Sequence, residues 1–546
     1  MLDESIIDYE LIEAVIDHID AQHGPGAILV FLPGIAEISK VLDRLTATSN
    51  KNSRRWVIPL HSSVSAAEQR QAFNRPPQGV RKVVLATNIA ETSLTIADVC
   101  FVIDAGRLKE RRHDASRGMG LLIEDWVSRA SALQRKGRAG RVQEGMCFSL
   151  FTRQRFEHQM RKFQAPEMVR VPLEELVLQI HLLRLGKAYA FLQRVLEPPP
   201  AKSVEGALAQ LQSVGALSKE EVLTPLGHHL AQLPVDARMG KLLVVAALLG
   251  CLAPALTVAA CLSYKSPFSA PVGQQDQARR AMQGLATAGT SSLASGQQSD
   301  HLLMVAAYEG WQAAKKQGRN AQRSFAQRHF LSEQTLEMIS DMRNQFGSML
   351  ADTRLLARPA KGFERSGSWI DDHSEIWNLY AKHVAVVKAA LCSALYPNIA
   401  VMEDGPDGNK RPAWNDGYSE VAVHPSSINH MLSANQYQRP YQIYLEKVRT
   451  SKVFMRDCTV IAPMTLLLFG GSLDILHQSG YVQIDGWLRI KAAAPLAVLV
   501  KQLRQALESV LEKTIATTSE TSESADHSIL QQVATLLDDE ERQLTL

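Results

Sequence analysis

The pattern of apolar and polar positions divides the chain into parts of different character. Up to about residue 157, apolar runs of five or six residues alternate with longer stretches in which apolar residues recur every three or four positions. This alternation is typical of a parallel sheet that is covered by helices on both faces. The strands are predicted at 27–32, 56–60, 82–86, 99–104 and 147–151, and a helix is predicted at 35–46.

The pattern then becomes helical. We predict that Ser203 caps the second of three short helices and that Gly215 ends it, because these residue types favour those positions. The segment 216–224 predicts a small β-wing. The three helices are predicted at 173–185, 203–214 and 225–232.

Residues 236–380 have a mostly helical pattern. The most apolar stretch, 241–262, is interrupted by Gly250 and Pro254, so it predicts a pair of buried helices and not a membrane span. The segment 284–298 is rich in Ala, Ser, Thr and Gly, and we predict a mobile loop there.

From about residue 386 the pattern changes to strands. Alternating segments and turn-forming glycines fit a small β-barrel. A helix is predicted at 494–514, and the segment 517–528, rich in Ser, Thr and Glu, is predicted to be disordered. The strand-like segments are 441–448 and 453–460, with further turns at 470–471 and 485–487.

The charge is unevenly distributed, although the net charge is only +3. Between residues 107 and 162 there are 14 Lys and Arg against 6 Asp and Glu, a local excess of +8. Between residues 502 and 546 there are 3 against 9, a local excess of −6. The basic segment favours a polyanion partner such as a nucleic acid, with an ordinary solvated surface as the alternative.

The six cysteines indicate neither a disulfide framework nor a metal site. None forms a Cys-x-x-Cys pair, and the closest two, Cys251 and Cys261, have no histidine at ligand spacing nearby. We therefore expect reduced thiols in an intracellular protein, cytoplasmic or nuclear, with no metal ligands. The first residues show no signal-peptide pattern, and no membrane association is expected.

Two strings of residues carry the candidate chemistry. The string QRKGRAGR at 134–141 places Arg138 and Arg141 three residues apart, so that both guanidinium groups would lie on one face if the string opened a helix. Two planar, always-charged groups directed at one point suit a polyphosphate. The second string is ATNIAETSLTI at 86–96, which follows a predicted strand.

Together these strings resemble motifs VI and V of superfamily 2 helicases, in particular the DEAH-box and RNA helicase A-like group. LPGIAEI at 32–38 and LHSS at 60–63 resemble motifs IV and IVa, and TSKVFMRDC at 450–458 resembles part of the OB-fold of the same group. The sequence contains neither the G-x-x-x-x-G-K-[ST] loop nor the Asp-Glu-x-His box. The chain thus looks like the C-terminal half of such a motor, without its first RecA domain.

The resemblance implies a site for a nucleotide. Arg138 and Arg141 would neutralise the charge that develops on the transferred phosphoryl group, and Gln134 would orient the γ-phosphate or the attacking water. Thr95 would touch the nucleotide, and Phe73 would stack on the adenine.

One position departs from the family pattern. Where relatives carry an aspartate that binds the ribose, this chain has Ala97, with Asp98 next. The ribose contact is therefore in doubt, and weak base specificity is expected. The implied cofactor is ATP with Mg²⁺, shared with the first RecA domain.

The resemblance also implies contacts with RNA along most of the chain. Thr87 and Asn88 would bond to an RNA phosphate from the end of a strand. A basic β-hairpin that includes Arg111 and Arg112 would wedge between nucleic-acid strands. The remaining implied contacts are Gly34, Ser62, Ser63, Ser263, Lys265, Arg449, Lys452 and Arg456.

The implied fold is an α/β RecA-like domain followed by mostly α winged-helix and helical-bundle domains and a β-barrel OB-fold. The expected divisions are 1–157 (RecA-like), 158–235 (winged helix), 236–380 (helical ratchet domain with the mobile loop 284–298), 381–492 (OB-fold) and 493–546 (C-terminal helix and acidic, partly disordered tail).

Two functions remain open from the sequence. The first is an enzyme, the C-terminal portion of an ATP-dependent RNA helicase that moves 3′ to 5′ and unwinds RNA. The second is a non-catalytic RNA-binding or scaffold protein without its own ATPase half. The expected partners are RNA, a first RecA domain in cis or in trans, and a protein activator.

Overall fold

The structure is a computed structural model of the 546-residue chain. Its described residues form two compact units, and each is treated by itself. The first unit comprises 1–112, 122–170 and 269–276, and the second comprises 113–121, 171–268 and 277–546. The described residues are 6–48, 55–61, 66–91, 95–114, 119–141, 144–269, 274–287, 293, 298–356, 368–403, 411–449, 452–477, 479–517 and 524–542.

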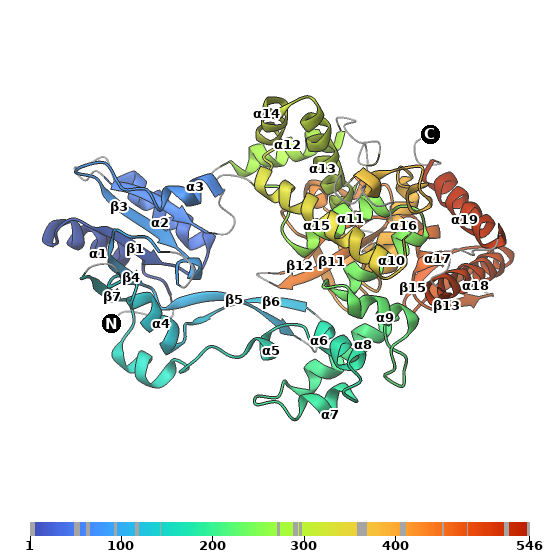
Figure 1. Ribbon diagram of the computed structural model, residues 1–546, viewed down its shortest axis with the longest axis horizontal. Helices are drawn as coiled ribbons and strands as arrows, with labels where there is room; N and C mark the ends of the chain where they lie inside the picture. The colour runs from blue at the N-terminus through green and yellow to red at the C-terminus, as the bar shows by residue number, and fades with distance from the viewer. Residues whose placement is uncertain are drawn as a thin grey trace. The chain divides into compact units, whose positions relative to one another are not determined.

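A five-stranded parallel sheet forms the centre of the first unit (Figure 1). Every residue of β1 and β4 is buried, which explains why these strands appear in the sequence as continuous apolar runs. All five predicted strands are present. In sheet order they are β2 (Arg55–Leu60), β3 (Arg81–Ala86), β1 (Ala27–Phe31), β4 (Val99–Asp104) and β7 (Met146–Ser149).

Successive residues of β1 enter different cores on the two faces of this sheet. Ile28 and Val30 pack with α1 (Tyr9–Gln22) and α2 (Ile35–Thr48), whereas Leu29 packs on the opposite face. Helix α1 begins at Asp8, whose carboxylate accepts the N–H of Leu11 at 2.9 Å. The shorter segments α3 (Ala66–Gln71), η2 (Asn88–Ala90) and α4 (Arg129–Lys136) also belong to this unit.

Strands β5 (Arg107–Asp114) and β6 (Met119–Trp126) are neighbours in one sheet and form the β-hairpin that the resemblance implied. Residues 115–118, between the two strands, lie outside the described residues. The first unit ends with β7, a short π-helical turn (Arg155–Gln159) and α5 (Glu167–Arg170).

The second unit begins with short helices around a small antiparallel bridge between Leu217 and Leu223, where the β-wing was predicted. Gly215 ends the second predicted helix at φ +84°, as expected. Ser203 does not cap it: Pro200 occupies the cap position with φ −56°, so the helix begins directly after the prolines. The helices are α6 (Glu174–Leu182), α7 (Ala188–Leu192), α8 (Ala201–Val214) and α9 (Pro225–Gln232).

The predicted pair of buried helices is present as α10 (Ala237–Leu248) and α11 (Leu252–Ser263). Gly250, with φ +70°, lies between the two helices. Pro254 lies in the first turn of α11, where backbone N–H groups have no partner within the helix, so its missing N–H costs no helical hydrogen bond. No helix in the described ranges is long and apolar enough to cross a membrane.

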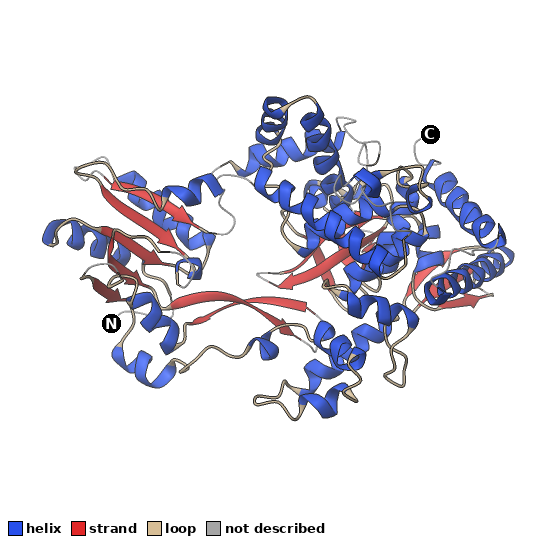
Figure 2. Ribbon diagram, viewed as in Figure 1, coloured by secondary structure: helices blue, strands red, loops and turns tan. Residues whose placement is uncertain are grey.

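Further helices complete this part of the second unit (Figure 2). The predicted mobile loop 284–298 begins inside a helix, because residues 284–287 belong to α12. Its residues 288–292 and 294–297 lie outside the described ranges. The helices are α12 (Gln275–Thr287), α13 (Asp300–Lys316), α14 (Arg319–Arg328), α15 (Glu333–Asp352) and α16 (Val384–Leu395).

Five strands of the second unit close into the predicted β-barrel. Their order is β12-β10-β9-β8-β11, and β11 pairs again with β12. A short helix α17 (Pro463–Phe469) and a three-stranded antiparallel sheet follow. The barrel strands are β8 (Ile399–Glu403), β9 (Ala413–Asn415), β10 (Glu420–Val423), β11 (Tyr441–Arg449) and β12 (Val453–Val460), and the sheet strands are β13 (Leu473–Leu476), β14 (Tyr481–Ile484) and β15 (Leu488–Lys491).

The C-terminal region contains a helix that we did not predict. The expected α18 (Ala494–Thr517) is followed by α19 (Ser524–Arg542), which includes part of the segment predicted to be disordered. Its apolar residues Val533 and Leu537, four positions apart, are buried in the same core as α16. Residues 518–523 lie outside the described ranges.

We predict that Gly227→Ala destabilises the chain, because an added Cβ would lie 2.0 Å from the backbone carbonyl oxygen of Ala216. Overpacking of this kind costs about 1–3 kcal/mol. Gly284→Ala is the matched control: its Cβ would meet no atom within 4 Å, and alanine favours the helix. Thermal unfolding should show a Tm several degrees lower for Gly227→Ala only, and equal Tm values for the two variants would contradict this packing.

Candidate functional site

The arginine string closes a helix and does not open one. Helix α4 ends at Lys136, Gly137 takes the C-cap position, and the residues from 137 to 140 form a turn. The N–H of Arg138 donates to the carbonyl of Arg135 at 3.0 Å, a bond typical of such a turn. The condition under which Arg138 and Arg141 would share one face of a helix is therefore not met.

The turn nevertheless brings both arginines to one small hollow, which we call the arginine hollow. Thr95, from the second string, also lines it, and the apolar remainder of the lining comes from the sheet and its neighbouring segments. The residues that line the hollow are Leu29, Ala90, Thr95, Ile96, Val99, Arg138 and Arg141.

The electrostatics of the arginine hollow favour an anion. Burial lowers the pKa of Arg138, the charge of Arg141 lowers it further, and Glu91 acts in the opposite direction. Two like charges held close together over an apolar floor repel each other, and a bound polyphosphate would relieve that repulsion. Among the described residues the lining includes no carboxylate, so the arrangement fits the phosphates of a nucleotide.

Arg135, to which the sequence analysis gave no function, is the buried anchor of this site. Its guanidinium lies 3.1 Å from Glu91 of the second string and 2.9 Å from Asp104 at the end of β4. It also lies 4.8 Å from the centre of the Phe31 ring. Arg135 therefore connects both strings to the sheet. The sequence alone does not show that Arg135 is buried while the later arginines of the same string are not.

A second ion pair lies where the family pattern was broken. The fully buried ammonium of Lys82 donates to the half-buried carboxylate of Asp98 at 2.7 Å. Asp98 thus makes a structural ion pair within the unit, which deepens the doubt about a ribose contact at this position.

The same ammonium fixes the segment that carries Phe73. It donates to the carbonyls of Ala72 and Asn74 at 2.9 Å each, on either side of Phe73. The Phe73 ring remains 42% exposed, so it is accessible for stacking while its backbone is held. Gln134 is also exposed, on the last turn of α4.

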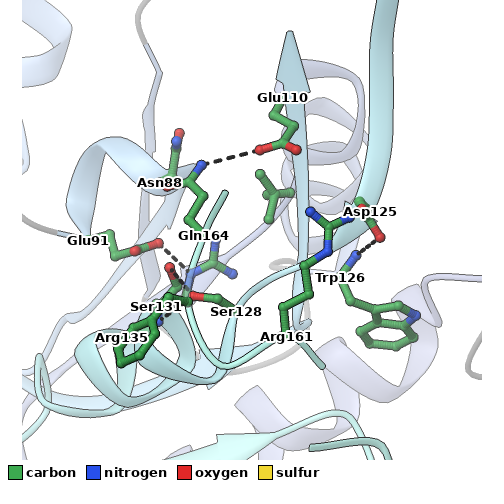
Figure 3. A pocket seen from close by; sticks show the side chains of 12 residues that line it. Asn88, Glu91, Glu110, Asp125, Trp126, Ser128, Ser131, Arg135, Arg161 and Gln164 are labelled. Carbon is green, nitrogen blue, oxygen red and sulfur yellow. Dashed lines mark hydrogen bonds and ion pairs between the residues drawn. The ribbon is translucent and has the colours of Figure 1, made fainter. Parts of the chain in front are cut away.

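The two residues of motif V differ in exposure. Thr87 is buried and directly precedes the short helix η2, whereas Asn88 is exposed at its first position. Asn88 lines a second, larger hollow at the base of the hairpin, which we call the hairpin hollow (Figure 3). The structure therefore brings Asn88 next to the hairpin, as contacts with one RNA strand would require.

Both acidic and basic groups line the hairpin hollow (Figure 3). Gln164 donates to Glu110 at 3.2 Å, and Arg161 pairs with Asp125 at 3.0 Å. The hollow is lined by Asn88, Glu91, Leu108, Glu110, Asp125, Trp126, Ser128, Ser131, Arg135, Arg161, Phe163 and Gln164.

Other predicted RNA contacts in the first unit vary in accessibility. Gly34 is buried: the Lys109 side chain packs over it and pairs with Glu37 at 2.8 Å. The side chains of Arg111 and Arg112, in β5, and the residues Ser62 and Ser63 lie outside the described parts of the chain.

The predicted contacts of the second unit lie on two different elements. Ser263 and Lys265, at and after the end of α11, are exposed. The other three lie on β11 and β12 or directly beside them. Arg449 ends β11 and Lys452 directly precedes β12, and both are exposed; the half-buried Arg456, in β12, pairs with Glu446 at 3.2 Å. Arg449, Lys452 and Arg456 therefore all belong to the pair of neighbouring barrel strands β11 and β12.

The fold and these sites define the class of a superfamily 2 helicase, and five domain families match the chain in consecutive order. They are the helicase conserved C-terminal domain (10–143), the winged-helix helicase associated domain (207–235), the ratchet-like helicase associated domain (236–334), the oligonucleotide/oligosaccharide-binding fold (387–473) and the C-terminal domain in RNA helicases (480–539). The chain belongs to the DEAH-box and RNA helicase A-like family. Its matched domains fit the C-terminal half of such a helicase.

Curated relatives agree with this assignment over 94% of the chain. The chloroplastic DExH-box ATP-dependent RNA helicase DExH4 of Arabidopsis thaliana is 46% identical over 528 residues. The putative ATP-dependent RNA helicase DHX57 and the ATP-dependent DNA/RNA helicase DHX36, both of Homo sapiens, are 41% and 40% identical over 555 and 523 residues. The chain spans 37%, 39% and 49% of the length of these three relatives, respectively.

We predict that Lys82→Met destabilises the chain by about 3–5 kcal/mol, because it leaves the Asp98 carboxylate and two carbonyls without their buried donor. Arg153→Met is the control, since its ion pair with Glu157 is exposed to solvent and little stability is lost with it. Denaturation monitored by circular dichroism compares the two variants. Equal losses of stability would show that the Lys82 pair does not hold this segment.

Proposed function

We propose that this chain is the C-terminal portion of an ATP-dependent RNA helicase that couples ATP hydrolysis to 3′-to-5′ translocation on RNA and to its unwinding. The observation that carries the proposal is the arginine hollow, because Arg138, Arg141 and Thr95 line it together and two arginines beside each other suit phosphates. The family membership of the chain and the ATP-dependent RNA helicases among its relatives support the same reaction.

In this proposal the nucleotide is shared between two RecA domains. Arg138 and Arg141 contact the γ-phosphate and stabilise the charge that develops on it, while Gln134 orients the phosphate or the attacking water. Thr95 and Phe73 contact the nucleotide, with the Phe73 ring on the base. When bound, Mg²⁺ neutralises phosphate charge, and its ligands come from a first RecA domain supplied in cis or in trans.

RNA is held by both units in this proposal. Thr87 and Asn88 contact its phosphates, and the hairpin β5–β6 separates its strands. Gly34, Ser62, Ser63, Arg111 and Arg112 add contacts from the RecA-like domain, and Ser263, Lys265, Arg449, Lys452 and Arg456 add contacts from the ratchet domain and the OB-fold. A protein activator that acts on the ATPase cycle is a further expected partner.

The domain divisions stated above, from the RecA-like domain at 1–157 to the C-terminal helices after 492, are part of the same proposal. They are supported by the order of the matched families and by the closed barrel between β8 and β12.

We expect the purified chain to bind single-stranded RNA with an affinity that falls steeply with salt, because its predicted contacts are mainly with phosphates. It should hydrolyse no ATP by itself. Fluorescence anisotropy over a salt series, with phosphate release measured in parallel, tests both points. RNA-stimulated hydrolysis by this chain alone would contradict the shared nucleotide site, and an absence of RNA binding would contradict the proposal as a whole.

In a motor that carries both RecA domains, we expect Arg138→Ala to lower kcat for RNA-stimulated ATP hydrolysis by about 10³-fold or more, the range found for arginine fingers. RNA binding should change less than twofold. Arg153→Ala serves as the control, because its exposed side chain pairs only locally with Glu157. A parallel loss of RNA binding and hydrolysis in Arg138→Ala would remove Arg138 from the nucleotide site.

A further inference from the structure

The turn between β9 and β10 presents an aromatic side chain to solvent. Tyr418 is 93% exposed, more than any other aromatic residue in the described chain. An aromatic ring of this size contributes most to stability when it is buried, so the fold itself gains little from Tyr418 at this position.

This turn is nevertheless held in one conformation. The buried carboxylate of Asp416 accepts the N–H groups of Tyr418 and Ser419 at 3.0 and 2.8 Å, and it pairs with the Lys447 ammonium at 2.6 Å. Burial raises the pKa of Asp416, but these bonds lower it more, so the net pKa lies below its usual value. The turn is therefore fixed around a charged acceptor.

Gly417 adds a second constraint. Its φ of +87° lies in the region that favours glycine, and an added Cβ would lie 2.9 Å from the ring of Trp487. Its N–H donates to the side-chain oxygen of Asn415 at 2.8 Å. The backbone on both sides of Tyr418 is therefore fixed before any ligand binds. Binding at the exposed ring would cost little conformational freedom of this turn.

The ring lies at the same end of the barrel as the predicted RNA-binding arginine and lysine. Strand β10 runs parallel to β12, with Ala422 opposite Phe454, so the first residues of these two strands lie at one end of the barrel. Arg449 ends β11 and Lys452 directly precedes β12, at this end. Within the barrel, the Lys447 ammonium lies 6.0 Å from the centre of the Tyr418 ring.

We propose that Tyr418 is a stacking residue for an unpaired base of single-stranded RNA, with Arg449 and Lys452 on the adjoining phosphates. Exposed aromatic rings beside cationic groups are the arrangement by which OB-folds bind single strands. This inference rests on the proposed function, because it names one contact through which the barrel binds RNA. No residue between β9 and β10 was identified from the sequence.

The test measures binding of the chain to a fluorescein-labelled single-stranded RNA and to a ribose-phosphate oligomer of equal length without bases. We expect Tyr418→Ala to weaken RNA binding about five- to tenfold, as loss of one stacked base does. Tyr418→Phe should stay within twofold of the unchanged chain. On the oligomer without bases, Tyr418→Ala and the unchanged chain should bind equally.

Two controls separate stacking from other causes. Tyr481→Ala removes a partly exposed tyrosine of β14, outside the barrel, and should leave RNA binding unchanged. The salt dependence of binding should be the same for Tyr418→Ala as for the unchanged chain, because no phosphate contact is lost.

Several outcomes would overturn the inference. Unchanged RNA binding in Tyr418→Ala, or an equal loss on the oligomer without bases, would show that the ring does not stack on a base. Salt-dependent RNA binding that is indifferent to Tyr418 would refute this inference and leave the proposed function intact. A chain that binds no RNA at all would refute both.

Discussion

The paired burial of Arg135 is the interaction on which the candidate nucleotide site depends. A guanidinium inside a protein is stable only when carboxylates and hydrogen bonds replace its water. Here Asp104 and Glu91 provide them, from the end of a central strand and from the second motif string. Three segments far apart in the sequence must therefore meet at one point, and the turn that carries Arg138 and Arg141 starts from that point.

The cations of this region are used in two different ways. Arg135 and Lys82 are buried and neutralised by carboxylates, so they hold the backbone of the motif strings and of the Phe73 segment in place. Arg138 and Arg141 lie beside each other over an apolar floor. A rigid frame of paired charges thus supports a small positively charged surface, which is the preorganisation that binding of a polyphosphate needs.

Much of the fold could be predicted because its elements leave local signals. The central strands of the first unit are buried on both faces and so appear as apolar runs, and Gly215 and Gly250 end their helices by a local property. The motif strings likewise identified Thr95, Arg138 and Arg141, which the structure brings to one hollow.

What the sequence did not predict depends on contacts between distant segments. Helix α19 has a narrow apolar face among polar residues, and its burial becomes evident only beside α16. The arginine string closes α4 because Gly137 ends that helix, and the spacing of the arginines alone does not show this. Asp98 pairs with Lys82, which is 16 positions away in the chain, so its structural role is not visible locally. Tyr418 is exposed because its turn is held by Asp416, and Asp416 pairs with Lys447 of the distant strand β11.

Helix α19 also changes how the charge of the chain should be understood. The last 45 residues carry an excess of −6, yet Glu541 pairs with Lys388 at 2.6 Å, Asp538 contacts His383, and Glu540 accepts the N–H of Met464 at 3.1 Å. These carboxylates are directed inward against α16 and α17. Three of the nine carboxylates of the C-terminal segment therefore act as an internal counter-charge that braces the second unit, and the segment contributes less to the outer field met by an approaching polyanion than a count along the sequence suggests.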